Sequence, residues 1–312
     1  MKILTAWLGH FLTQNLHHPQ TLLRHNHFTM PNIPSDKRKF DIIKSIPFIA
    51  LHLGAAVGIF IARPTVSLLL ICLASYLIRM FAITAGYHRY FSHHSYQLNR
   101  FSQFCLAWLG TCAVQKGPLW WASNHRYHHR HSDDKSDIHS PVQDGFWWSH
   151  IGWIFSNAHD ATRWDLIPDL KKYPELIFLN TWYLLPPLVM GFGLFLWGGV
   201  QIFIWGGLIA TVLLFHGTAT INSLSHVFGS RRYKTTDASR NNFILALITL
   251  GEGWHNNHHA YMASARQGFF WWEIDLSYYT LRALSWVGIV SGLKQPPLEK
   301  LKLQLIKPIP FQ

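Results

Sequence analysis

Long apolar runs alternate with polar segments along the chain, and the long runs come in two pairs. The first pair covers residues 42–62 and 65–86, which are separated only by Arg63 and Pro64. Each run has about the 20 residues that an α-helix needs to cross the hydrocarbon core of a bilayer. Because a two-residue break leaves no room for a loop, the pattern predicts a tight helical hairpin whose outer ends emerge on one side of a membrane.

A second pair covers residues 176–197 and 200–221, which are joined by a Gly-Gly turn at 198–199. A Pro-Pro pair at 186–187 falls inside the first of these runs. Membrane helices tolerate such residues where neighbouring groups satisfy the carbonyls that proline leaves free. The chain therefore predicts an all-α integral membrane protein with four transmembrane helices in two hairpins.

Two hairpins place three polar regions on the same side, namely residues 1–41, 87–175 and 222–312. These regions hold nearly all the Lys and Arg, whereas the other side keeps only Arg63 and the uncharged Gly-Gly turn. The positive-inside rule then predicts that the polar side is cytoplasmic and forms a helical cap. We expect a bacterial inner membrane rather than the endoplasmic reticulum. The N-terminus has no apolar core followed by a small-residue cleavage site, so we expect no signal peptide.

Two further apolar stretches are interpreted differently. Residues 101–115 are somewhat short for a span, so we expect a helix lying at the membrane interface. Residues 268–293 are long enough but contain Glu273, Asp275 and Arg282. Their many Phe, Trp and Tyr residues favour an interfacial or packed helix over a span.

Composition supports a membrane protein. Charged residues make up 13% of the chain, against roughly 25% in a typical soluble domain, and 49% of residues are hydrophobic. The chain has 15 Trp and 11 Tyr, the residues that membrane–water interfaces favour. The net charge of +12 suggests attraction to anionic headgroups or to an acidic carrier rather than to nucleic acid. The three cysteines form no CxxC pair, so no structural disulfide is expected.

Nine histidines fall in three tight clusters and one separate position beside the apolar runs, and all of them belong to the predicted cytoplasmic side. The motifs are HRYFSH, HRYHH and HNNHH, with a single histidine in NSLSH. The residues are His88, His93, His125, His128, His129, His226, His255, His258 and His259.

The spacing of these histidines suits two metal ions. On a helix, His125 and His129 share a face, while His128 points about 100° away from His129. HNNHH repeats this arrangement. The five-residue spacing of HRYFSH is less natural on one helical face, so we expect a helix end and loop to turn both rings inward. Nine imidazoles exceed the four ligands of a structural zinc site, and imidazole alone permits Zn, Cu, Fe or Ni.

The remaining histidines are interpreted as surface, structural or outer residues around a site. Those expected at the surface are His10, His17, His18, His25 and His27. Those given a structural or supporting role are His94, His131, His139, His150, His159 and His216.

The motifs resemble those of a known family, the membrane-bound fatty acid desaturases, and most closely its Δ9 acyl-CoA (stearoyl-CoA desaturase-like) branch. The matching segments are ITAGYHRYFSHHSY, NHRYHHRHSDDKSDIHSP, GFWWSHIGW and GEGWHNNHH. Histidine motifs alone would also admit membrane hydroxylases and sterol oxidases. The resemblance runs from about residue 42 to residue 290.

The resemblance implies a non-haem di-iron centre that uses O2 to introduce a cis double bond into a saturated acyl chain, with water as the other product. It implies that Asn222 contacts one iron through water. By position in the family, the ligands of the first iron would be His88, His93, His125, His129 and His259. Those of the second would be His128, His226, His255 and His258.

Two departures from the family pattern concern the substrate. Animal acyl-CoA enzymes have an Arg-Asp pair before the second histidine motif, where this chain has Ser123 and Asn124. The carrier is therefore acyl-CoA, acyl carrier protein or a lipid, with acyl-CoA the first expectation. The family's acyl tunnel ends against the second span, where the spacing indicates Tyr76 and Met80. We expect the bulk of Met80 to limit chain length.

Electrons are expected from a separate carrier of cytochrome b5, ferredoxin or rubredoxin type, since the chain has no haem motif, CxxC cluster or dinucleotide-binding fingerprint. One alternative is a membrane hydroxylase on the same di-iron scaffold. A metal transporter is disfavoured, because it would place ionisable ligands along its spans, which here contain few such groups besides His52, Arg79 and His216.

Overall fold

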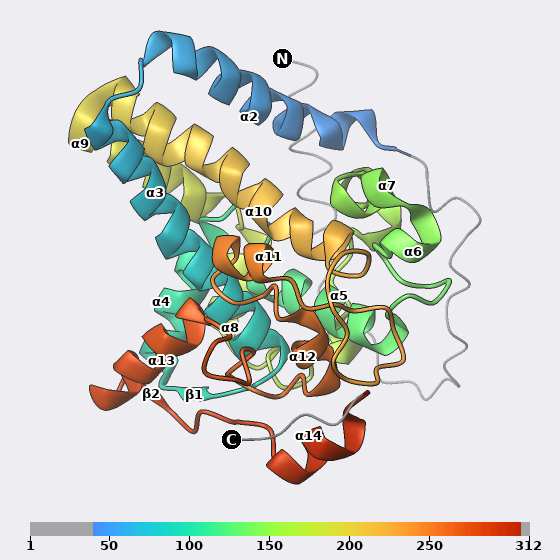
Figure 1. The fold of residues 1–312 in the computed structure, drawn as a ribbon. Helices are drawn as coiled ribbons and strands as arrows, with labels where there is room; N and C mark the ends of the chain where they lie inside the picture. The colour runs from blue at the N-terminus through green and yellow to red at the C-terminus, as the bar shows by residue number, and fades with distance from the viewer. Residues whose placement is uncertain (1–39, 307–312) are drawn as a thin grey trace.

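The computed structural model describes residues 40–306, and nearly all of the regular secondary structure in this part of the chain is helical. An elongated bundle of apolar helices stands on a broader cap of short helices and loops (Figure 1). The two strands, β1 (Gln97–Leu98) and β2 (Val290–Ser291), pair antiparallel with Gln97 opposite Ser291. The predicted surface histidines between residues 10 and 27 lie outside the described residues.

Both helices of the first predicted pair are present. Helix α2 (Ile42–Ile61) starts at Asp41, whose carboxylate accepts from the backbone N–H groups of Ile43 and Lys44. Helix α3 (Val66–Phe81) starts at Thr65, whose hydroxyl accepts from Leu68 N. The second helix does not stop near residue 86 as expected, because it widens into a π-helix, η1 (Ala82–Ser92).

The second pair differs more from the prediction. Helix α8 (Pro174–Thr181) ends at Trp182, and α9 (Leu185–Ile202) begins three residues later, so the expected single helix over 176–197 is wrong. The Pro-Pro pair lies in the first turn of α9 instead of kinking a span, which suits proline because the first helical N–H groups need no intrahelical partner.

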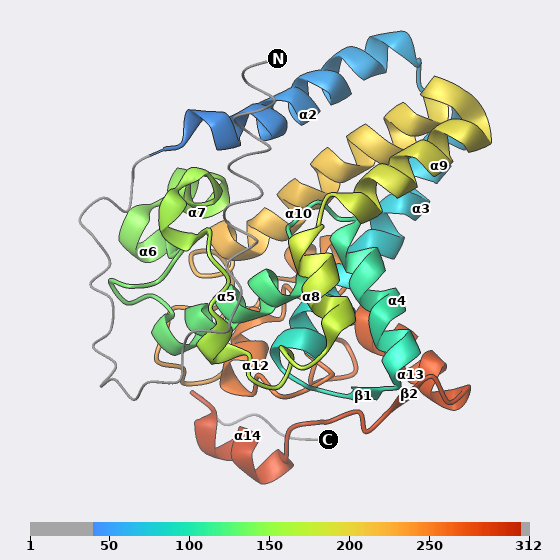
Figure 2. The ribbon, with the colours of Figure 1, turned by 180° about the vertical axis from the view of Figure 1, so that it is seen from behind.

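The chain reverses direction at Gly198 and Gly199. Their backbones are non-helical, and Gly199 has φ +69°, a conformation that favours glycine. The chain returns through a second π-helix, η5 (Phe203–Ile209), into α10 (Ala210–Leu224), beside α9 (Figure 2). By length and composition, three helical stretches of the described chain could cross a membrane: Ile42–Ile61, Val66–Ser92 and the reversing stretch Leu185–Leu224.

The remaining helices build the cap. Helix α4 lies against η1, α8 and α9, so the predicted interfacial helix at 101–115 is partly packed. Only part of the apolar stretch 268–293 is helical. The bounds are α4 (Arg100–Thr111), α5 (Pro118–His131), α6 (Pro141–Asp144), α7 (Phe146–His150), η2 (Gly152–Phe155), η3 (Asn157–His159), η4 (Trp164–Leu166), α11 (Phe243–Ile248), α12 (His255–Ala260), α13 (Leu276–Trp286) and α14 (Leu298–Gln304).

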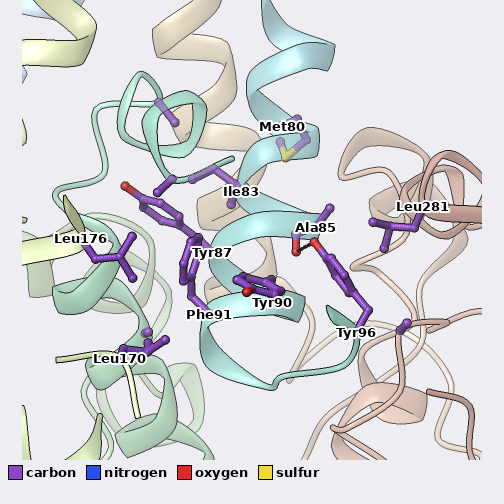
Figure 3. Packing of buried hydrophobic residues seen from close by; sticks show 14 of the residues in the cluster. Met80, Ile83, Ala85, Tyr87, Tyr90, Phe91, Tyr96, Leu170, Leu176 and Leu281 are labelled. Carbon is purple, nitrogen blue, oxygen red and sulfur yellow. Dashed lines mark hydrogen bonds between the residues drawn. The ribbon is translucent and has the colours of Figure 1, made fainter. Parts of the chain in front are cut away.

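The main hydrophobic core surrounds η1, all of whose residues are buried. Figure 3 shows Tyr87 and Phe91 of η1 on one side, Tyr96 on the other and Tyr90 between Phe91 and Tyr96. The Tyr96 hydroxyl donates to the Ala85 carbonyl at 2.7 Å. By contrast, α2 leaves many apolar side chains exposed, as expected of a helix that faces lipid. The core therefore supports the first histidine motif more than it supports the apolar bundle.

A buried arginine joins the bundle to the cap. The guanidinium of Arg79 is 2% exposed and donates to Thr211 Oγ1 at 2.5 Å, to Gly206 O at 3.2 Å and to Cys112 O at 3.4 Å. These acceptors belong to α10, η5 and the end of α4. Because Arg79 precedes Met80 and η1, these hydrogen bonds hold the entry to the first histidine motif in place.

Candidate metal centre

The first histidine motif depends on the π-helix. Successive residues of an α-helix are about 100° apart, so His88 and His93 would point about 140° apart. A π-helix pairs residues i and i+5 instead, which brings them towards one face. The two ring centroids are 4.9 Å apart. The chain thus brings the rings together by widening the helix, and His93 lies at its C-cap, so a helix end contributes as expected.

The second and third motifs lie on α5 and α12. On α5, His125 and His129 occupy one face and their Nε2 atoms are 2.9 Å apart. The His128 side chain projects from another face of α5 and belongs to a different group of histidines. On α12, His255 and His259 form the i, i+4 pair, with ring centroids 4.4 Å apart.

The nine predicted ligands converge as two separate groups. In each group, the candidate ligand atoms lie within 4.8 Å of one another. The five-histidine group comprises His88, His93, His125, His129 and His258, and the four-histidine group comprises His128, His226, His255 and His259.

This division corrects one expectation. By position in the family, His259 was placed with the first set and His258 with the second, but the structure exchanges them. The reason is helical periodicity, because His255 and His259 share a face of α12 and His258 points elsewhere. The same periodicity separates His128 from His125 and His129 on α5.

The contacts within the five-histidine group favour a bound cation. Each neutral Nε2 offers either one hydrogen or one lone pair, so five such atoms can form at most two ordinary hydrogen bonds among themselves. Four close contacts are observed. The Nε2 atoms lie 3.0 Å apart in His88–His258, His93–His125 and His129–His258, and 2.9 Å apart in His125–His129.

The four-histidine group also fits a metal. His226 Nε2 and His255 Nε2 are 3.1 Å apart. His259 Nε2 is buried and has no hydrogen-bond partner within residues 40–306. A buried nitrogen without a partner is costly, and a metal bond would remove that cost.

Carboxylates hold the other ring nitrogen of four ligands. Hydrogen bonds of this kind fix the ring tautomer and present Nε2 to a metal. The pairs are His88 Nδ1 with Glu252 at 2.5 Å, His128 Nδ1 with Asp137 at 2.9 Å, His226 Nδ1 with Asp133 at 2.7 Å, and His259 Nδ1 with Asp237 at 2.6 Å.

The electrostatics keep most of these imidazoles neutral. Burial, reinforced by neighbouring histidines, lowers the pKa of five rings well below its usual range, and burial lowers the pKa of His259 to about 4. The five are His93, His125, His129, His255 and His258. Burial opposes ionisation of Asp137 and Asp237, but His128 and His259 outweigh it and lower the pKa of both carboxyls. Neutral imidazoles and ionised partners are the states that bind metal.

A pocket lies between the two groups. It reaches from the histidines to an apolar end formed by the last turn of α3 and the start of η1. Its lining residues are Met80, Ile83, Thr84, His88, Trp121, His125, His128, His139, Thr218, Ile221, Asn222, His226, Thr249, Glu252 and His255.

Only some of the residues predicted to contact the substrate or a metal-bound water line this pocket. Met80 and Asn222 line the pocket. Tyr76 lies behind Met80, and its hydroxyl donates to Ile248 O at 2.8 Å. Ser123 and Asn124 are buried outside the pocket lining, where both hydrogen-bond to Arg163.

Sequence reasoning missed the four carboxylates. A signal was available, because the chain has only 15 acidic residues and two of these four lie in SDDKSD, directly after the second motif. His139 was given a supporting role, and it lines the pocket with its ring centroid 4.4 Å from that of His128. His139 also lies close to His128 and Asp137, which together form a third group of possible metal ligands. Because Asp137 is hydrogen-bonded to His128 Nδ1, we interpret it as a partner of that ligand and not as a ligand itself.

Comparison with known proteins places these residues in context. Residues 64–288 match the family model described as "Fatty acid desaturase". The chain is 38% identical over 262 residues to "Delta-9 acyl-lipid desaturase 1" of Arabidopsis thaliana, covering 83% of this chain and 85% of the relative. It is 38% identical to "Acyl-CoA C20 Delta5-desaturase" of Anemone leveillei, with 72% and 73% covered. It is 36% identical to "sn-2 palmitoyl-lipid 9-desaturase" of Nostoc sp. (strain 36), with 69% and 77% covered.

Proposed function

The chain belongs to the fatty acid desaturase family, and from this premise we propose that it introduces a cis double bond at the Δ9 position of a saturated acyl chain. In this proposal the nine histidines hold two iron ions. One observation carries it: two converging sets of imidazoles face the same pocket, and the other end of that pocket is apolar. The relatives that act on this position are named Δ9 acyl-lipid and palmitoyl-lipid 9-desaturases.

The residues present suit this chemistry. A di-iron pair held by these imidazoles would supply the activated oxygen that removes hydrogen from two adjacent CH2 groups. The chain's own part is to position the acyl segment between the groups. Met80, Ile83 and Trp121 provide apolar walls, while Glu252 and the three aspartates keep the ligand rings in one orientation. Asn222 lines the pocket, and its proposed role is to contact one ion through water.

The depth of the pocket is proposed to limit chain length. A Cβ added at Gly217 would lie 2.6 Å from the Tyr76 hydroxyl and 3.0 Å from Met80 Cε, so α10 closes this end tightly. Met80→Ala should shift the products towards longer chains, and Gly217→Ala should shift them towards shorter chains. Lipid analysis of both variants measures this. Leu73→Ala, on an exposed position of α3, is the control. Unchanged profiles in both pocket variants would contradict the proposal.

The carrier is proposed to be a membrane lipid. Ser123 is fully buried and Asn124 is 2% exposed, and both are engaged with Arg163. They therefore offer no charged surface to a large polar carrier such as the acyl-CoA first expected. The relatives include enzymes named for acyl-lipid substrates and enzymes named for acyl-CoA substrates. Supplying the purified enzyme with labelled acyl-CoA or with labelled phospholipid, and measuring which one gains a double bond, distinguishes the two carriers.

We propose the four-span topology with the cap in the cytoplasm of a bacterium. The reversal at Gly198 supports two crossings within Leu185–Leu224. The arm of α9 before Gly198 is short for a span, and α8 precedes it in the same general direction (Figure 2). In the proposed division, residues 42–86 and 176–221 form the two transmembrane hairpins. The cap is formed by residues 1–41, 87–175 and 222–312. An electron carrier of cytochrome b5, ferredoxin or rubredoxin type would dock on the cap.

The test is expression in a desaturase-deficient host, with mass spectrometry of the lipids to locate any new double bond. A cis-9 alkene without retained oxygen is expected, and it should be absent with a His128→Ala variant. A hydroxylated product would favour the hydroxylase alternative, and a double bond elsewhere would overturn the Δ9 assignment alone.

A further inference from the structure

We propose that the two metal positions are unequal, and that the four-histidine group binds its ion more tightly than the five-histidine group. The inference rests on the proposed di-metal function, and it concerns the charged residues behind the ligands. A count of imidazoles alone would predict the opposite order, because the weaker group has one ligand more.

The four-histidine group is backed by three aspartates, one each on His128, His226 and His259. Each carboxylate is itself anchored by a backbone N–H. Asp133 Oδ2 accepts from Ala238 N at 2.8 Å, Asp137 Oδ2 from Asp133 N at 2.8 Å, and Asp237 Oδ1 from Ser239 N at 2.9 Å. These anchors keep the negative charge in place whether or not a metal is bound.

The five-histidine group has one such carboxylate, Glu252 on His88, and its charge is shared. Arg89 Nε and Nη2 each lie 3.1 Å from Glu252 Oε1, and Arg89 Nη1 donates to Asp275 at 2.9 Å. Each group also has one ligand whose Nδ1 is buried with no partner in the described part of the chain, His129 here and His255 in the four-histidine group, so the two groups differ in their carboxylates and not in this respect. The Gln267 carboxamide, which is neutral, lies against the Nδ1 atoms of His88 and His258.

Charge makes the asymmetry larger. An imidazole binds a metal in its neutral form, so the charge of a buried ion must be balanced from outside the ligand set. The three aspartates place three negative charges around the four-histidine group. Glu252 and Asp275 with Arg89 leave one net negative charge around the five-histidine group. Together these residues carry a net charge of minus four, which matches two divalent cations. Three of the four negative charges lie around the four-histidine group.

The magnitudes favour the aspartates over the extra imidazole. Losing one outer partner of a ligand histidine typically lowers metal affinity about 10–100-fold. Two more carboxylates on the four-histidine group therefore correspond to about 100-fold or more in affinity. We accordingly expect the ion of the five-histidine group to leave first.

The experiment uses the full-length protein in detergent, loaded with ⁵⁷Fe(II) under anaerobic conditions to two ions per chain. A chelator is then applied, and bound iron is followed by metal analysis and Mössbauer spectroscopy. We expect two release phases of one ion each, at least about tenfold apart, with one of two distinct doublets disappearing first.

A matched pair of variants assigns the phases. Asp237→Asn removes a charge behind the four-histidine group while its amide oxygen still accepts from His259, so it should accelerate only the slow phase, about 10–100-fold. Glu252→Gln should accelerate only the fast phase. Asp133→Asn repeats the first test at another ligand in case one variant does not fold.

Release of both ions in one phase from the wild-type protein would overturn the inference, as would acceleration of the slow phase by Glu252→Gln alone. Neither result would affect the proposed function if the loaded protein still forms the alkene. Failure of the proposed function would appear differently, as a protein that retains fewer than two ions or makes no double bond.

Discussion

Two sets of histidines in this protein show opposite uses of the same side chain. In the metal-binding groups, Nε2 atoms from several elements converge on common points. A second set, here called the histidine chain, consists of His52 on α2, His216 on α10 and His150 at the end of α7. Its rings are bonded end to end: His52 Nε2 lies 3.1 Å from His216 Nε2, and His216 Nδ1 lies 3.0 Å from His150 Nε2.

The difference lies in which nitrogens remain free. In the histidine chain, both nitrogens of each ring are engaged, since His52 Nδ1 bonds Phe48 O at 2.7 Å and His150 Nδ1 bonds Ser223 Oγ at 2.9 Å. In the metal-binding groups, carboxylates take Nδ1 of four rings and leave Nε2 available. Close histidines alone therefore do not make a metal site. A metal site also needs lone pairs that converge and partners that hold the opposite nitrogen.

The largest effect is expected from His258→Ala. His258 lies between His88 and His129, with both Nε2 contacts at 3.0 Å, so its loss opens the five-histidine group. We expect the variant to retain about one metal ion per chain and to form no detectable alkene. Metal analysis and lipid analysis measure the two effects.

The matched control is His216→Ala, which removes a histidine from the histidine chain. It should retain both ions. Loss of metal from His216→Ala comparable to that from His258→Ala would erase the distinction between the two sets, and full metal content in His258→Ala would show that His258 is not a ligand.

Acidification is expected to release metal from the converging groups. Burial lowers the pKa of His125, His129 and His258, so in the folded protein these rings stay neutral, whereas an unfolded chain takes up protons near pH 6.5. The unfolded state then binds more protons, and the free energy of unfolding falls as the pH drops below about 6.5. Protons also compete with metal for imidazole.

The measurement is the unfolding midpoint and the metal content between pH 8 and pH 5. Both should decline towards acid, with the metal-free protein losing stability first. A metal-free protein that becomes more stable towards pH 5 would contradict the lowered pKa values.

The sequence predicted the chemistry of the site better than its geometry. All nine histidines of the two groups could be named because their clustering is local, and the helices α2 and α3 followed from apolar runs broken at Arg63. The division of the ligands was predicted wrongly at His258 and His259, although helical periodicity was sufficient to assign them. The π-helix of η1 could not be predicted, because its width depends on the core that surrounds it. The partners Glu252 and Asp237 also depend on tertiary contacts that no spacing reveals.

The smallest effect is expected within the histidine chain itself. His216→Ala leaves His52 Nε2 and His150 Nε2 without their partner, and an unsatisfied buried polar group costs about 1–3 kcal/mol. Because His52 and His150 each keep the hydrogen bond at Nδ1, a decrease in the free energy of unfolding at the lower end of that range is expected. His52→Gln, at the end of the histidine chain, should lower the free energy of unfolding less, because it leaves only one nitrogen of His216 unpaired. Denaturant titration in detergent measures both variants, with Lys171→Ala, at an exposed position of the cap, as reference. If His52→Gln proved more damaging than His216→Ala, the three rings would not act as a chain centred on His216, and the contact between α2 and α10 would instead depend on His52 alone.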